Sequence, residues 1–476
     1  MEPFRGSRPR VLLHVDERRR DIVVLTALKR LCEEAGCRVV LSTRRTTAMY
    51  LNQMTFEAIV VPSVEHIPYE RLTSLSGRSK IYVLPTEGAL FEEKTLLSKY
   101  AGGVDPDRWP RQLECTHRVL LWGDHSRRIL RNTGRFRDEQ LTVVGAPRMD
   151  FFMAEPSDEE KALWEPSSLA LICDFVLMNS YMSRNIFEKI DLGQSGRGVY
   201  QAQSRWMEDR FWIESAWIRV WLAFLDECQR RKEPVRLRIH PRENPAAYDY
   251  IKRKYGGLVA LDQQDVPFEA WLKRVGILAG FNSTTFFELV ATSSPAICLE
   301  GLIGARLEEH IDHFLQNHYP IMDYIETPTS FEELFDLIKR MRRGSWKAET
   351  AYGPQAREIL RDVCSFPRTE SALVTIVRTL LNDAGDSTDS RGLHAHFMEV
   401  LARMQAKTLE WITFGLRREP VTSAWFPMEE SHFERQHRAH LERYARAALF
   451  RENAGSSHPA PRTDQELCSL GGKEAP

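Results

Sequence analysis

Apolar runs alternate with amphipathic stretches over the first 300 residues, and this alternation predicts strands that are followed by helices. In the first half of this region, short apolar strands are predicted at 10–15, 37–42, 57–63, 80–85, 117–123 and 141–147. The pattern then restarts, with strands predicted at 168–178, 235–240, 257–261, 276–280 and 295–300. Apolar strands that alternate with helices are typical of parallel sheets covered on both faces.

The pattern therefore predicts an α/β protein with two Rossmann-like domains. An acidic stretch that contains Pro and Ser, 151–168, separates them. Because ligands bind at the carboxyl ends of strands in open α/β folds, we expect a ligand cleft between the two sheets. The predicted division is an N-terminal domain at 1–155, a C-terminal domain at 165–328, closing helices at 329–384, a helical extension at 385–452 and a disordered tail at 453–476.

Composition narrows the function classes. The chain has 476 residues, of which 43% are hydrophobic and 28% charged, as in soluble globular proteins. With 65 basic and 66 acidic residues there is no overall positive field, which argues against a general nucleic-acid binder. The eight cysteines form no CxxC pair, and no apolar run approaches the roughly 20 residues that span a bilayer. We expect reduced thiols and a cytoplasmic location.

Two strand-to-helix junctions in the second domain could bind phosphate. In VRLRIHPRENPAAYDYI (235–251) the predicted strand ends at His240, and Pro241 and Arg242 follow it. A new helix opens at Asn244. By itself this stretch slightly favours the alternative, a solvated basic edge strand with a routine turn. Its significance depends on the second junction.

The second junction is GILAGFNSTTFFELV (276–290). Gly280 allows close backbone approach, and Asn282, Ser283 and Thr284 open a helix whose unpaired N–H groups would favour an anion. The alternative is an ordinary Ser/Thr helix cap. Two such junctions in one domain shift the interpretation towards a phosphate site.

The first domain offers acidic and basic candidates. Glu87 directly follows a strand in PTEG, where a general base or nucleophile would face the cleft, and Gly88 would supply backbone freedom. In VVGAPRMDFF, Arg148 could hold a phosphate or carboxylate through paired hydrogen bonds, unless it forms a loop ion pair with Asp150. An exposed loop acid is the alternative for Glu87.

The stretch VDERRRD (15–21) adds Asp16, Glu17 and Arg20 as further candidates to face the cleft, although a solvated helix start is an equal alternative. No metal motif is found: EEHIDHF (308–314) has two histidines but no third ligand. We therefore expect neither a metal nor a cofactor.

Taken in order, VLLHVDERRRDI, PTEG, WGDHS, VVGAPRMDFF, RIHPRE and GFNSTTFFELV resemble the motifs of bacterial surface-carbohydrate biosynthesis proteins. These are GT-B-like proteins related to capsule Kdo transferases, polysialyltransferases and CDP-glycerol glycerophosphotransferases. The resemblance covers roughly residues 10–300. It departs at Arg20-Asp21, where Arg-Glu is expected, and at Ala146, where Asn is more usual; the region after 385 has no recognised counterpart.

The resemblance implies a role for each matching residue. His240, Arg242, Ser283 and Thr284 would hold the phosphate of a CMP-sugar. Glu87 becomes the leading catalytic candidate, and Asp150 a second acid or an orienting residue.

Three functions stay open. The first is a glycosyltransferase that uses a CMP-activated acidic sugar, such as Kdo, to build a surface polysaccharide on a glycan or glycolipid acceptor. The second is transfer of a polyol phosphate from a CDP-alcohol, and the third is a non-catalytic GT-B module in glycan assembly. An apolar stripe at 393–416 with basic neighbours leaves peripheral membrane association open as well.

Overall fold

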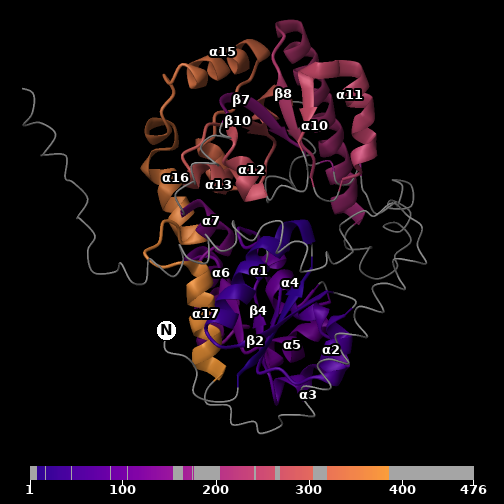
Figure 1. The fold of residues 1–476 in the computed structure, drawn as a ribbon, viewed down its shortest axis with the longest axis vertical. Helices are drawn as coiled ribbons and strands as arrows, with labels where there is room; N and C mark the ends of the chain where they lie inside the picture. The colour runs from indigo at the N-terminus through magenta and orange to yellow at the C-terminus, as the bar shows by residue number, and fades with distance from the viewer. Residues whose placement is uncertain are drawn as a thin grey trace, which may run out of the picture.

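In the computed structural model of the chain, the described residues are 8–384 apart from 17, 44–45, 86, 104, 154–164, 174, 176–178, 180–203, 241–242, 263–267 and 304–318. The predicted extension at 385–452, which includes the stripe at 393–416, and the predicted tail at 453–476 lie outside the described residues. Within them, two parallel sheets form two α/β domains, as predicted (Figure 1).

The N-terminal sheet has the strand order β2-β1-β3-β4-β5-β6, and every pair of neighbours is parallel. Its strands are β1 Arg10–Val15, β2 Arg38–Thr43, β3 Ala58–Val61, β4 Lys80–Val83, β5 Arg118–Leu121 and β6 Leu141–Val143. Its helices are α1 Arg18–Glu34, α2 Thr47–Gln53, α3 Leu72–Ser76, α4 Glu93–Ala101, α5 Trp109–Cys115, α6 Asp124–Asn132 and α7 Asp150–Met153. The strand order reverses between β1 and β3, so a topological switch point lies there.

Apolar strands allow this sheet to be covered on both faces. Alternate side chains point to opposite faces, so Leu13 packs into the core beneath α1. Its neighbour Leu12 packs into the core on the other face, with residues of α3, α4 and α5.

The C-terminal sheet has the order β11-β10-β7-β8-β9, again with parallel pairs. Its strands are β7 Glu165–Ile172, β8 Val235–Arg238, β9 Val259–Leu261, β10 Val275–Gly280 and β11 Ala296–Cys298. The helices that accompany it are α10 Ser204–Arg231, η7 Pro245–Tyr248, α11 Asp249–Tyr255, α12 Phe268–Leu272, α13 Thr285–Ala291 and α15 Phe331–Arg342. Its switch point lies between β7 and β10.

The closing helices join the two domains. α15 packs into the C-terminal core through Leu334 and Phe335. α16 (Ala348–Cys364) is kinked at Gly353, which has a positive φ of 64° directly before Pro354. α17 (Ala372–Ala384) returns to the N-terminal domain and packs against α1, as Figure 1 shows. The region predicted as one closing unit is thus shared between both domains.

From the sequence we expected reduced thiols and found no apolar run long enough to span a bilayer, and the described residues bear on both points. Their cysteines are buried and free of disulfides. None of the described helices combines the length and apolarity that crossing a bilayer requires.

Asp150 anchors α17. Its carboxylate accepts hydrogen bonds from the Ser371 hydroxyl at 2.7 Å and from the backbone N–H groups of Ala372 and Leu373 at 3.0 and 2.8 Å. Burial raises the pKa of Asp150, and the three hydrogen bonds oppose that rise. The geometry gives Asp150 the task of holding a helix N-terminus, and its predicted part in catalysis stays a prediction.

Asp150→Ala is expected to lower the free energy of unfolding by about 1–3 kcal/mol, because it leaves two buried N–H groups at the start of α17 without their acceptor. Urea unfolding measures this. Asp138→Ala removes an exposed acid of the same domain and serves as the control, with no change expected beyond that of a surface ion pair. If Asp150→Ala kept the wild-type free energy of unfolding and lost glycosyl transfer, the result would instead support the predicted catalytic role of Asp150.

Candidate functional site

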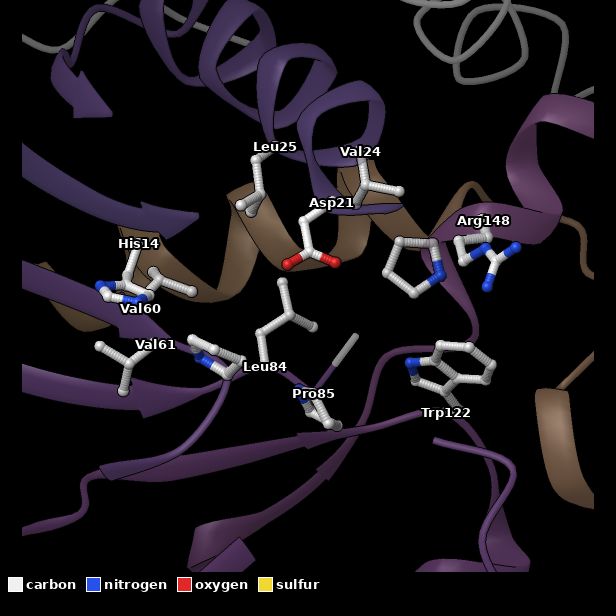
Figure 2. A pocket seen from close by; sticks show the side chains of 12 residues that line it. His14, Asp21, Val24, Leu25, Val60, Val61, Leu84, Pro85, Trp122 and Arg148 are labelled. Carbon is white, nitrogen blue, oxygen red and sulfur yellow. The ribbon is translucent and has the colours of Figure 1, made fainter. Parts of the chain in front are cut away.

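A pocket lies at the carboxyl edge of the N-terminal sheet, and we call it the strand-end pocket (Figure 2). Its lining comes from the ends of several strands and from α1: His14, Asp21, Val24, Leu25, Val60, Val61, Pro62, Leu84, Pro85, Trp122, Pro147 and Arg148. The cavity volume is about 20 Å³, which is room for about one water molecule. A ligand larger than water could enter only if the strand-end loops and α1, which line the pocket, moved apart.

Asp21 supplies the carboxylate of the lining. It is 1% exposed, and it stands in the first turn of α1 with its carboxylate directed into the pocket (Figure 2). Of the residues that the sequence singled out here, Asp16 is partly buried just after β1, Glu17 lies outside the described residues, and only the backbone of Arg20 is described. Asp21 was not chosen, although it shares the helical spacing of the buried Val24 and Leu25.

Glu87 lies on the loop that follows β4, as predicted, and its side chain is partly exposed. Pro85 of the same loop lines the pocket. From the sequence we expected Gly88 to supply backbone freedom. This reason was wrong, because the glycine does not adopt a positive φ. A Cβ at Gly88 would instead lie 2.3 Å from Cγ of Trp122, so glycine is needed for close packing of the loop on that ring.

Arg148 reaches from the N-terminal domain to two acids of the C-terminal domain. Its Nη2 lies 2.8 Å from Oε1 of Glu288, and its Nε lies 3.8 Å from Oε1 of Glu269. Burial raises the pKa of Glu288 to about 7; Arg148 opposes this rise and Glu269 adds to it. Arg148 does hold carboxylates, but they belong to the protein, and the alternative pairing with Asp150 is not formed.

Apolar side chains close the interface around this ion pair. Ala89, Trp122 and Met149, which follow strands of the first sheet, share a buried cluster with Phe286 and Phe287 of α13. The rings of Phe91 and Phe287 lie 6.1 Å apart. The carboxyl edges of the two parallel sheets therefore adjoin, as the sequence predicted.

His240 follows β8 at the edge of the second sheet and is partly buried; Pro241 and Arg242 lie outside the described residues. Glu243, which the sequence did not single out, fixes this loop. Its fully buried carboxylate accepts the backbone N–H of Phe175 at 2.9 Å and the hydroxyl of Tyr248. Its own N–H donates to the carbonyl of His240 at 3.0 Å. The loops after β7 and β8 are thereby tied together.

The second predicted junction follows β10. A Cβ at Gly280 would lie 2.6 Å from Cγ1 of Ile172, so the close approach that requires glycine is to β7. The N–H of Asn282 donates to Glu300 at 3.3 Å, and the hydroxyl of Ser283 accepts the N–H of Thr285 at 3.3 Å. This last bond closes a local turn just before α13, whose N-cap residue, Thr284, makes no side-chain capping hydrogen bond. Phosphate binding by Ser283 and Thr284 stays a prediction.

No family model matches the sequence, and no curated protein matches it by sequence. Solved structures do match the fold. The wall teichoic acid polymerase TagF is 10% identical, over 80% of this chain and 90% of that chain, with a TM-score of 0.50. The Methanocaldococcus jannaschii UDP-GlcNAc 2-epimerase is 11% identical over 78% and 99%, and S. aureus MnaA with UDP is 11% identical over 80% and 98%, each with a TM-score of 0.44.

The likeness to TagF shows a fold class. The protein has a GT-B-like fold, with two α/β domains whose parallel sheets adjoin at their carboxyl edges. At such low identity the comparison concerns the fold alone, so the resemblance to surface-carbohydrate proteins stays a prediction from the sequence.

Proposed function

We propose that the protein is a GT-B glycosyltransferase that transfers a sugar from a CMP-activated donor to a surface-polysaccharide acceptor. The observation that carries this proposal is the meeting of two parallel sheets at their carboxyl edges, where open α/β folds bind ligands. His240 stands at one edge, and the Glu87 loop and Asp21 stand at the other.

The proposed chemistry divides between the edges. His240, Arg242, Ser283 and Thr284 would bind the donor phosphate. When the anomeric carbon–oxygen bond breaks, its electron pair stays on the phosphate oxygen, and a protonated His240 would stabilise that charge. Glu87 would take the proton of the acceptor hydroxyl, or attack the anomeric carbon itself if configuration is retained. Kdo or a related acidic sugar is the donor sugar that the sequence motifs favour.

A second candidate is transfer of a polyol phosphate from a CDP-alcohol. The support for it is the fold of TagF, which is named a wall teichoic acid polymerase. In this reaction a phosphorus–oxygen bond breaks and the product gains phosphate, whereas sugar transfer leaves the phosphate on the nucleotide. The phosphate content of the product separates the two reactions.

Calorimetry with CMP and with CDP tests the proposed nucleotide site. We expect His240→Ala to weaken CMP binding by about 10- to 100-fold, the effect of losing a charged hydrogen bond to phosphate. His117→Ala, which alters a partly buried histidine paired with Asp383, is the control and should bind CMP normally. If the wild-type chain binds neither nucleotide, the non-catalytic glycan-assembly function becomes the better explanation.

A further inference from the structure

Three side chains of the N-terminal domain form a cluster at the switch point between β1 and β3. His14 lies in β1, Asp16 follows it, and His66 ends the short helix η1 (Val64–His66) after β3. One ligand atom from each lies within 4.8 Å of the other two. The imidazole ring centroids are 4.4 Å apart, and Nε2 of His66 lies 3.7 Å from Oδ1 of Asp16. His14 also lines the strand-end pocket, so the cluster borders that space.

Thr47 holds the ring of His14. The Thr47 hydroxyl oxygen lies 2.7 Å from Nδ1 of His14, 2.8 Å from Oγ of Ser42 and 2.9 Å from the carbonyl oxygen of Thr43. When this hydroxyl donates its single hydrogen to Thr43 or Ser42, it accepts a hydrogen bond from Nδ1 of His14, and Nε2 of His14 then carries the lone pair. A hydrogen bond from the far nitrogen is the arrangement that orients metal-binding histidines and makes them more basic.

We propose that His14, Asp16 and His66 bind one divalent transition-metal ion. Two imidazole nitrogens and one carboxylate oxygen are a donor set that suits Zn²⁺, whereas Mg²⁺ prefers oxygen ligands only. Three protein ligands leave a coordination position for water or an exogenous ligand. The proposal departs from the expectation of no metal, which rested on motif spacing: residues 14, 16 and 66 match no such motif, and the β1–β3 pairing brings them together.

Binding requires a local adjustment. Zinc–ligand bonds of about 2.0–2.2 Å place tetrahedral ligand atoms roughly 3.4 Å apart, which is closer than the 4.8 Å limit of the cluster. The two rings are stacked with planes 22° apart, and one must turn to bring the ion into both planes. The torsion of a histidine ring is broad, so this turn is accessible.

Calorimetry of Zn²⁺ into the full-length, tag-free, chelator-treated chain tests the site. We expect one ion per chain and no competition from millimolar Mg²⁺, which prefers oxygen ligands. Asp16→Asn and His66→Ala should each weaken binding at least about 100-fold, since the first replaces a charged carboxylate ligand by a neutral amide and the second removes an imidazole ligand. Thr47→Val should weaken it about 10- to 100-fold while keeping all three ligands.

His125→Ala is the matched control, because Nδ1 of His125 lies 3.7 Å from Oδ2 of Asp362, the same separation as in the His66–Asp16 pair. Zinc binding should be unchanged in this variant. Melting in chelator shows whether each variant is folded. The proposal is overturned if the wild-type chain binds no stoichiometric zinc, or if folded Asp16→Asn and His66→Ala bind it as wild type does. Because the readout is metal binding, it is independent of CMP binding and of the proposed transfer.

Discussion

Glu87→Gln is expected to reduce sugar transfer by about 10²- to 10⁴-fold while CMP binding stays at the wild-type level. The substitution keeps the shape of the side chain and removes the group that accepts a proton or attacks carbon. Glu87 lies between Pro85, which lines the strand-end pocket, and Gly88, which packs against Trp122. The loop is thus fixed at the sheet edge where the acceptor would bind. Transfer from a CMP-activated sugar and CMP calorimetry, measured on the same preparation, separate catalysis from binding.

Two further acids make this test specific. Glu93→Gln changes the first turn of α4, a few residues further along the chain, and should leave transfer unchanged. Asp21→Asn changes the carboxylate inside the pocket. If Glu87→Gln transfers sugar normally and Asp21→Asn does not, the catalytic acid is Asp21, and the role carried over to Glu87 is wrong.

The sequence predicted the sheets well because their signal is local. Every strand of a parallel sheet buried on both faces must be apolar, so a run such as 10–15 is visible without knowledge of its neighbours. Helical connections then require parallel pairing. The destination of α17 could not be predicted in this way, since its start is held by Asp150, more than 200 residues earlier in the chain, and its apolar face packs with α1.

The candidate site was predicted less completely, for a related reason. Motif spacing identifies residues that act together within one loop, such as those around His240. Glu243 belongs to the same motif, but its task of accepting the N–H of Phe175 depends on the neighbouring strand. Likewise, the partners of Arg148 lie in the other domain, and the strand order brings His66 to His14. A polar residue inside an apolar run, such as His14 in β1, was the available signal.

The buried ion pair at the domain interface makes stability depend on pH. Burial raises the pKa of Glu288 to about 7, whereas a glutamate in an unfolded chain titrates near 4.3. Between these values the folded chain keeps a proton that the unfolded chain has released. The contribution of Glu288 to the free energy of unfolding is therefore fully present below about pH 4.3 and is lost as the pH rises through about 7. At about 1.4 kcal/mol per pKa unit, the change over the whole range is about 4 kcal/mol.

Glu288→Gln should remove this dependence, because glutamine stays neutral. Urea unfolding at several pH values between about 5 and 8 measures this. As the pH rises, the free energy of unfolding of the variant should increase relative to that of wild type by up to about 3 kcal/mol. Asp226→Asn is the control: a hydrogen bond from Lys254 lowers the pKa of Asp226, so its titration ends below this range and the difference from wild type should be flat. Parallel curves for Glu288→Gln and wild type would mean that Glu288 is ionised throughout. In that case Arg148 offsets the whole effect of burial, and Arg148→Met, which leaves Glu288 and Glu269 without their arginine, should destabilise the chain by about 3–5 kcal/mol.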